Sequence, residues 1–481
     1  MQYTKKLYNI LAYILRKIKN ITDERNFEHL RTVKQEYEIE ITERLKRRFP
    51  DMFNKYTRNV AEISEWRLAN SALLYDLGKY LESSEDIEEL IFLVKNLDLY
   101  LEDSFYECIP IDQETYTFIC LNDNYKECDI FLLPRVVCGW EHENRDAYTS
   151  YTIFYYLRNF YYLTQADIIN YQVENILMSK ELLWEAVERR ELRIMVSPVT
   201  GEKAVEITEP YTKSGSQFTA VKSIRSETEN RIKEKALNIL KQAAAEEADI
   251  LVFPEMLGTE AIAESIMLEL ENRETIVDNK FPALTMCPTI WKDHVNYCRV
   301  LNDTGEMICE QQKHHGVDLS DHIWNDLKED LRGASARDHY VKEDIRSDQK
   351  IYVLHCYGIG RIAVVICKDF IITGYLKIIV EKLRISLVIV PSFTHSDYQF
   401  KLIMPKYAEL DCNIVWLNTC SARWLSKAGE MKADVTSAFL SGKGGVDAQQ
   451  KGMKDFCGKQ CKCEEECIHT YRISLDMEEK E

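Results

Sequence analysis

Long apolar runs are missing from this sequence of 481 residues, and so is an excess of positive charge. No stretch reaches the roughly 18 apolar residues that a membrane-spanning helix requires. The first twenty residues lack the apolar core of a signal peptide, since Arg16, Lys17 and Lys19 interrupt it. We therefore expect a cytoplasmic protein without a membrane span, whose 15 cysteines are reduced thiols and not a disulfide framework.

The formal net charge of −18 argues against a general nucleic-acid-binding protein, because binding to phosphates needs a basic surface. The charge is uneven along the chain. Residues 1–50 carry 12 Lys/Arg and 7 Asp/Glu, whereas residues 51–150 carry 8 and 21. A basic N-terminal region is compatible with a protein or nucleic-acid partner, although a solvated helix face explains it as well.

The first part of the chain, residues 1–190, is predicted to be a mainly α-helical region of unknown type. Near its start Leu7, Leu11 and Ile18 share one helix face, which we interpret as packing within its own domain; a membrane-surface or partner-binding helix is the alternative. Short strands are expected at 115–121 and 129–137. The aromatic stretch 148–171 lacks interleaved Lys and Arg, so we interpret it as core and not as a surface that stacks bases.

The second part, residues 191–481, alternates short apolar runs with helical patterns, which is typical of a layered α/β domain. A helix is predicted over 227–248, and polar insertions stand at about 200–224 and 318–340. Strands are predicted at 192–196, 250–253, about 283–290, 306–312, 351–356, 361–366, 387–390 and 413–418, with 470–475 closing the sheet.

Three of these strands end abruptly in a reactive side chain, namely Glu255, Lys313 and Cys367. Taken singly, each has an ordinary explanation: a first-turn helix carboxylate, a surface lysine and a buried thiol. Together they suit one chemistry. A thiol needs a base to become a nucleophile, and the tetrahedral adduct needs a positive donor for its oxyanion.

The three segments resemble the motifs of the nitrilase superfamily of carbon–nitrogen hydrolases. The resemblance lies in Val-Phe-Pro-Glu255 after an Ala-rich helix, in Lys313 at the end of a strand that begins at Gly305, and in Ile-Cys367-Lys-Asp. It continues through Val-Lys-Glu343, Pro-Ser after the next strand, and the strand that ends in Asn418. It thus covers about residues 191–476.

This resemblance implies an α-β-β-α sandwich that needs no cofactor for catalysis and pairs as a homodimer or a higher homo-oligomer. It implies that Cys367 is the nucleophile, that Glu255 is the general base, and that Lys313 holds the oxyanion together with the backbone N–H after Cys367. Glu343 would orient Lys313 and help to position the water that hydrolyses the thioester.

The sequence also departs from the family pattern. Lys368 stands where the family usually has an aromatic residue, and it either lowers the pKa of the thiol, marks an acidic substrate or reaches solvent. The usual Phe-Pro-Glu run after the cysteine is absent. Asp321 or Glu329, in the 318–340 insertion, could take the role assigned to Glu343.

Close to the C-terminus, four cysteines fall within 457–467, at Cys457, Cys461, Cys463 and Cys467. Four thiolates can enclose a structural Zn²⁺, although this spacing is not the usual pair of knuckles, and a loop with incidental cysteines is the alternative.

We predict a thiol hydrolase that acts on a non-peptide carbon–nitrogen bond of a small molecule, an amide more than a nitrile. Two other functions stay open at this point. The same triad makes an acyltransferase if an amine replaces water as the acceptor. Alternatively, the domain is a nitrilase-like binding or regulatory module in a multi-component system, such as bacterial defence, with residues 1–190 recruiting a partner.

Overall fold

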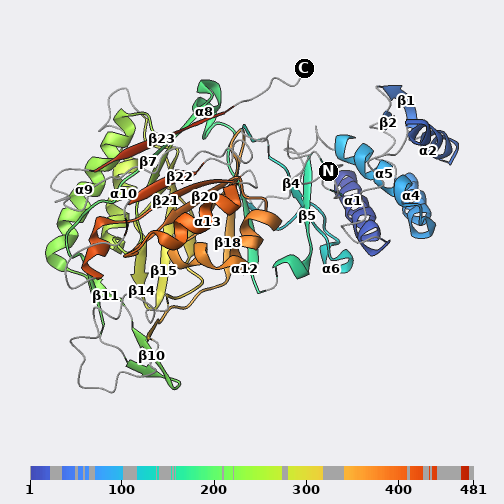
Figure 1. Cartoon of the computed structure of the whole chain (residues 1–481). Helices are drawn as coiled ribbons and strands as arrows, with labels where there is room; N and C mark the ends of the chain where they lie inside the picture. The colour runs from blue at the N-terminus through green and yellow to red at the C-terminus, as the bar shows by residue number, and fades with distance from the viewer. Residues whose placement is uncertain are drawn as a thin grey trace. The chain divides into compact units, whose positions relative to one another are not determined.

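A computed structural model gives the fold of the chain (Figure 1). It describes residues 2–21, 35–48, 53–57, 60–63, 71–100, 116–136, 138–139, 153, 157, 159–168, 170–208, 211–219, 221–272, 280–317, 341–408, 412–425, 433, 436–440 and 467–475. Statements below concern these residues.

The chain contains two compact units. Unit 1 comprises Met1–Val136, Glu141–Ile169 and Asn175–Leu177, and unit 2 comprises Val137–Trp140, Asn170–Glu174 and Met178–Glu481. No described helix is long and apolar enough to cross a membrane. The division near residue 190 that the sequence suggests stays a prediction.

Unit 1 begins with helices and continues with short strands. Its longer elements are α1 (Gln2–Ile21), α2 (Gln35–Arg48), the hairpin of β1 (Phe53–Thr57) and β2 (Val60–Ile63), α4 (Ser71–Ser83) and α5 (Ile87–Tyr100). The shorter ones are β3 (Thr117–Phe118), α6 (Tyr125–Cys128), β4 (Phe131–Pro134), β5 (Phe160–Leu163), the 3-10 helix η3 (Gln165–Ile168) and β6 (Gln172–Leu177), whose residues are shared between the two units.

The apolar face of α1 is buried inside unit 1. Leu7, Leu11 and Ile18 are almost fully covered, and α1 contacts α4, α5 and α6. The face predicted from the sequence therefore packs within its own unit, as the hydrophobic effect favours. Neither a membrane nor a partner is needed to cover it.

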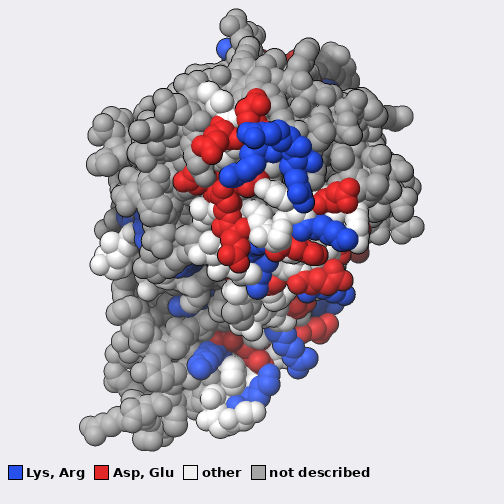
Figure 2. All heavy atoms as spheres, turned by 90° about the vertical axis from the view of Figure 1, so that its right-hand side faces the viewer, with Lys and Arg blue, Asp and Glu red and all other residues white. Residues whose placement is uncertain are grey.

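Two arginines of the basic N-terminal region pair with acidic groups of unit 1. Arg16 lies 3.2 Å from Asp129, and Arg44 lies 2.7 Å from Asp86 and 2.9 Å from the buried Glu89. Figure 2 shows acidic and basic side chains interspersed on the described part of the visible face. Arg16 and Arg44 are therefore paired within the unit.

The aromatic stretch contributes β5, in which Phe160, Tyr161 and Tyr162 are buried and pair in antiparallel register with β4. For these three residues the interpretation as core is confirmed. Burial removes them from any surface that could stack bases.

Unit 2 is a mixed α/β structure, as the sequence predicted, and its first sheet has the order β14-β15-β13-β12-β7-β23, with β16 on β15. The strands are β7 (Glu191–Val196), β12 (Ile250–Val252), β13 (Leu284–Met286), β14 (Ile290–Lys292), β15 (Val295–Asn302), β16 (Met307–Gln312) and β23 (His469–Ser474). Strands β7, β12 and β13 are parallel, and the others are antiparallel to their neighbours.

The second sheet has the order β22-β21-β20-β19-β18, which β6 continues. Its strands are β18 (Lys350–Cys356), β19 (Gly360–Val364), β20 (Leu387–Pro391), β21 (Asn413–Leu417) and β22 (Ser437–Leu440). Strands β19, β20 and β21 are parallel and fully buried, which explains their continuous apolar sequences.

Helices cover the outer sides of the two sheets. Helices α9 (Ser226–Ala245) and α10 (Glu260–Glu271) pack on the first sheet through a core that includes Ile239, Ile266 and Leu251. On the opposite side in Figure 1 lie α12 (Thr373–Leu376) and α13 (Tyr398–Ala408). The π-helix η7 (Lys377–Lys382) follows α12 directly and contacts it. The sheets meet between these layers, where the Tyr471 ring packs on Phe439.

The polar insertion 200–224 forms two antiparallel strand pairs, the second of them a hairpin between the strands of the first. Strands β8 (Val205–Ile207) and β11 (Val221–Ile224) pair with each other, and β9 (Tyr211–Lys213) pairs with β10 (Ser216–Thr219). Strand β10 also pairs in parallel with β17 (Val341–Glu343). We call residues 211–219 the arm; β10 lies at one end of unit 2 in Figure 1.

Candidate active site

Four side chains predicted from the sequence lie together in unit 2. Glu255 follows β12, Lys313 follows β16, Cys367 follows β19 at the start of the 3-10 helix η6 (Cys367–Ile371), and Glu343 ends β17. All four are buried. The strands set their positions, because Glu255, Lys313 and Cys367 each lie within three residues after the end of a strand, and Glu343 is the last residue of one.

Lys313 bridges two carboxylates. Its Nζ donates to Oε1 of Glu255 at 2.9 Å and to Oε2 of Glu343 at 2.8 Å. Burial alone would lower the pKa of Lys313, but the charges of Glu255 and Glu343 raise it well above its usual range. The ammonium group thus stays charged inside a covered site, where its field is strong.

Glu255 is held by both of its oxygens. Oε1 also accepts a hydrogen bond from Nδ2 of Asn296 at 2.8 Å, and Oε2 accepts one from the backbone N–H of Phe393 at 2.8 Å. Burial raises the pKa of Glu255, and Lys313 opposes the rise. A carboxylate with a raised pKa is suited to accept a proton and to return it.

The thiol of Cys367 is buried and lies close enough to Glu255 and Lys313 for both charges to act on its pKa. Burial raises the pKa of this thiol, Glu255 raises it further, and Lys313 acts in the opposite direction. The backbone at Cys367 has φ 46°, a left-handed conformation that side chains other than glycine rarely adopt. Such local strain is characteristic of active sites, where the surrounding fold maintains it.

Asp369 links the lysine loop to the cysteine turn. Its buried carboxylate accepts the backbone N–H groups of His314 and His315, each at 2.8 Å, and lies 2.8 Å from Nδ1 of His315. Because Lys313 and Cys367 stand beside these anchored residues in sequence, Asp369 fixes the distance between the cation and the thiol.

The remaining motif residues support the loop that carries Phe393. Asn418, at the end of β21, accepts from the backbone N–H of Thr394 at 2.9 Å and donates to its carbonyl at 2.7 Å. Ser392 accepts a hydrogen bond from the indole of Trp416 at 3.0 Å. The loop is therefore tied to the second sheet at the point where its Phe393 backbone N–H meets Glu255.

Two contributors were not singled out from the sequence. Asn296 lies on β15, a strand that was not predicted, and Asp369 was noted in the cysteine motif without a role. A polar residue flanked by apolar ones in Val-Asn-Tyr-Cys was the only signal for Asn296. The structure places Glu343 on Lys313, the contact considered also for Asp321 and Glu329, which lie outside the described residues.

The predicted zinc site is outside the described residues at Cys457, Cys461 and Cys463, and only Cys467 is described. Among the described residues, no group of three or more His, Cys, Asp or Glu side chains could hold a metal ion. Zinc binding by the four cysteines stays a prediction, which elemental analysis of protein purified without added metal tests.

Neither the models of protein families nor the curated proteins give a match to this chain. The solved structures that match include members of the nitrilase superfamily. Nit3 of Saccharomyces cerevisiae is 13% identical, with a TM-score of 0.38, and the match covers 59% of this chain and 90% of that one. An amidase from Nesterenkonia sp. is 12% identical, with a TM-score of 0.36, over 59% and 91% of the two chains. The NitFhit protein of C. elegans is 13% identical, with a TM-score of 0.38, over 59% and 61%.

Proposed function

We propose that this chain is a thiol hydrolase of nitrilase type, which cleaves a non-peptide carbon–nitrogen bond through an acyl-enzyme on Cys367. The observation that carries this proposal is the buried cluster in which Lys313 bridges Glu255 and Glu343, with the thiol of Cys367 buried within reach of the charges of Lys313 and Glu255. A base, a nucleophile and a fixed cation in one covered site are the parts that acyl transfer needs.

In the first step, Sγ of Cys367 attacks the carbon of an amide, and Glu255 takes the thiol proton. Because the pKa values of both groups are raised, the resting thiol is neutral, and proton transfer accompanies the attack. The C–N bond then breaks, and Glu255 returns the proton to the departing amine. The products of this half-reaction are a thioester on Cys367 and ammonia or an amine.

The tetrahedral intermediate carries negative charge on the former carbonyl oxygen. Lys313 is the positive donor for that oxygen, and the backbone N–H of Lys368, at the start of η6, is the second. Removing one such donor in other acyl-transfer enzymes costs about 10²–10³ in kcat. Lys313 is held by two carboxylates before substrate arrives, so little reorganisation is needed.

Water completes the reaction by attacking the thioester carbon. Glu255 accepts a proton from the water and passes it to Sγ of Cys367 as the C–S bond breaks, which restores the thiol and releases a carboxylic acid. Oε1 of Glu343 is buried and accepts no hydrogen bond from a described residue, so it can receive one from the attacking water or from the substrate.

Intact mass spectrometry after incubation with a panel of small amides and nitriles tests the proposal. We expect a mass increase equal to the acyl group, mapped to Cys367 and absent from Cys367→Ala, together with release of ammonia or amine. Turnover retained by Cys367→Ala would overturn the assignment. Transfer of the acyl group to an added amine in preference to water would show an acyltransferase with the same triad.

A further inference from the structure

The arm carries the strand partner of a residue in the proposed active site. Its hairpin turns at Ser214 and Gly215, which have φ 49° and 79°, the left-handed conformations that tight two-residue turns need. From this turn β10 runs parallel to β17, so that Thr219 stands in register with Glu343. The insertion therefore supplies the neighbour on which Glu343 is aligned.

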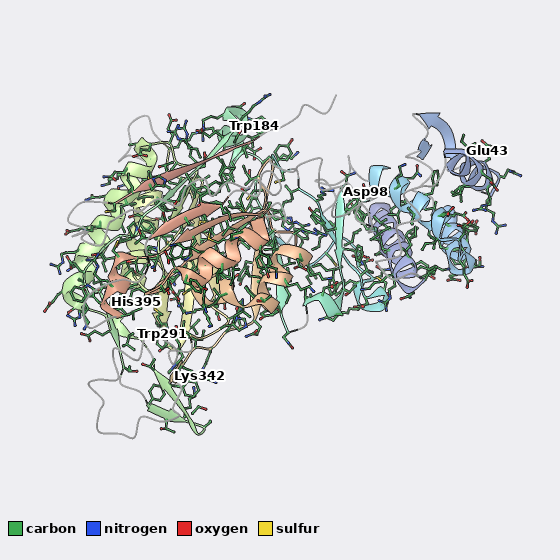
Figure 3. The ribbon with its side chains drawn as sticks, viewed as in Figure 1. Glu43, Asp98, Trp184, Trp291, Lys342 and His395 are labelled. Atoms are coloured by element: carbon green, nitrogen blue, oxygen red, sulfur yellow. The ribbon has the colours of Figure 1, made fainter. Side chains whose placement is uncertain are left out.

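The residue after Glu343 is clamped by the arm. The carboxylate of Asp344 accepts hydrogen bonds from the hydroxyl of Tyr211 and from Nζ of Lys213, the latter at 2.7 Å. The backbone N–H of Asp344 donates to the carbonyl of Thr219 at 2.8 Å. Nδ1 of His294 lies 3.1 Å from the same carboxylate. Figure 3 marks the same strand at Lys342, which is exposed.

The Asp344 carboxylate is nearly covered, and the two arm donors lower its pKa despite the opposite effect of burial. The charged form of Asp344 is thus the one that these contacts favour. We call the contacts of Tyr211 and Lys213 with Asp344 the clamp. A buried carboxylate that loses its partners destabilises the fold, because its charge is then left unpaired. The contact therefore stabilises the fold only while its geometry is kept.

Glu343 itself is held on its other side by the loop after Lys313. Its backbone N–H donates to the carbonyl of Val317 at 2.8 Å, and Oε2 accepts from the N–H of Val317 at 3.0 Å and from Lys313 at 2.8 Å. Glu343 therefore stands between two supports, the loop on one side and the arm on the other. If the contact with the arm is lost, Glu343 keeps only the support from the loop.

We propose that the arm is a positioning device for the active site: Tyr211 and Lys213 hold Asp344, and through it they hold the carboxylate of Glu343 against Lys313. This inference rests on the proposed function for its consequence in catalysis. Tyr211, Lys213 and Asp344 are positioning residues, since each acts through Glu343. An insertion remote in sequence thereby sets the charge balance around Cys367.

The charge balance provides a readout that needs no substrate. Glu343 is a negative charge near Lys313 and Glu255, and a nearby negative charge disfavours the thiolate. Moving Glu343 away leaves Lys313 less compensated, so the thiolate of Cys367 forms at lower pH. A defect confined to stability would lower the melting temperature but would not change the pH at which half of the Cys367 thiol is ionised, which we call the midpoint.

The experiment measures the rate at which iodoacetamide alkylates Cys367 as a function of pH, followed by mass spectrometry of the peptide that contains it. Glu343→Gln sets the reference, with a midpoint lowered by about 0.5 pH unit or more. We expect Lys213→Met and Asp344→Asn to lower the midpoint as well. Lys213→Arg, which keeps the positive charge, should have the midpoint of the wild type. Lys203→Met, an exposed lysine in the same insertion, is the matched control and keeps the wild-type midpoint.

Wild-type midpoints in Lys213→Met and Asp344→Asn would overturn the inference if Glu343→Gln shifts, and an unshifted Glu343→Gln would overturn it as well. The proposed function fails separately: if no amide or nitrile acylates Cys367 while the clamp variants still shift its midpoint, the arm positions Glu343 but the reaction is another one. Melting temperatures recorded in parallel identify any variant that fails to fold.

Discussion

Asn296 donates its side-chain amide to Oε1 of Glu255 at 2.8 Å, the oxygen that also accepts from Lys313. Asn296 is fully buried, and its backbone carbonyl accepts the N–H of Lys313 at 2.7 Å. One residue of β15 thus orients both the base and the cation. In this position it sets the direction in which Glu255 faces the thiol.

Asn296→Ala is expected to lower kcat while KM changes little. The substitution removes a hydrogen-bond donor to the base Glu255, but it removes no contact with the substrate. A hydrogen bond to a charged group is worth about 1.5–3 kcal/mol, which corresponds to roughly tenfold to a hundredfold in rate. Steady-state kinetics on a substrate found in the amide panel measures it. Asn302→Ala, at the turn that ends the same strand, is the control, and equal losses in both variants would contradict the assignment.

Much of this site was predictable because its residues follow apolar strands whose pattern is local. The segments before Glu255 and Cys367 are short, continuous and apolar, and β12 and β19 are indeed buried along their whole length. Each of these two strands is followed three residues later by its reactive residue, so locating the strand also located the residue. The mixed α/β class followed from the same alternation.

Strand β15 escaped prediction because Arg299 breaks its apolar run. That guanidinium is paired with Glu260 at 2.7 Å and with Glu310 at 3.2 Å, contacts that let a charged residue occupy a mostly covered strand. Its partner Glu260, in α10, lies far from Arg299 in sequence, so this contact cannot be predicted from the local periodicity of the strand. The contact of Asn296 with Glu255, across 41 residues, was hidden for the same reason.

The pairing of the arm with β17 was also not predicted from the sequence. The sequence marked residues 200–224 only as a polar insertion, since strand β10 is short and its partner β17 lies more than a hundred residues later. Parallel pairing between distant segments depends on the closed fold and not on local propensity. The link between the insertion and Glu343 is therefore a tertiary property.

Gly316→Ala is expected to displace Glu343. A Cβ at residue 316 would lie 2.5 Å from the carbonyl oxygen of Glu343, closer than atoms approach, so one backbone must shift. The cost of such overpacking is about 1–3 kcal/mol. Turnover and the Cys367 alkylation midpoint should both change, whereas Gly374→Ala, where nothing lies within 4 Å, should leave both as in the wild type. Equal behaviour of the two variants would show that the loop tolerates the methyl group.

The contribution of Asp344 to stability should depend on pH with a definite sign. Lys213 and Tyr211 lower the pKa of Asp344 below the ordinary value of 3.8 against the opposite effect of burial, so the native state favours the charged form more than the unfolded state does. The stabilisation is present above about pH 4 and is lost as pH falls through the lowered pKa. Lys213 is 43% exposed, which screens the pair and limits the effect to about 1 kcal/mol, or roughly 2–4 °C in melting temperature.

Melting curves of the wild type and Asp344→Asn between pH 7 and pH 2.5 measure this dependence. The wild type should melt higher at pH 7, and the two curves should converge only below the lowered pKa of Asp344, because Asp344 is then protonated in the native and the unfolded state. His294 also faces this carboxylate, so His294→Gln is recorded in the same buffers to separate its titration from that of Asp344. In Lys213→Met, which removes the main cation of the clamp, the difference made by Asp344→Asn should shrink at every pH. A difference that stays constant, or that grows on acidification, would mean that Asp344 is not held in its charged form and that the clamp does not operate as described.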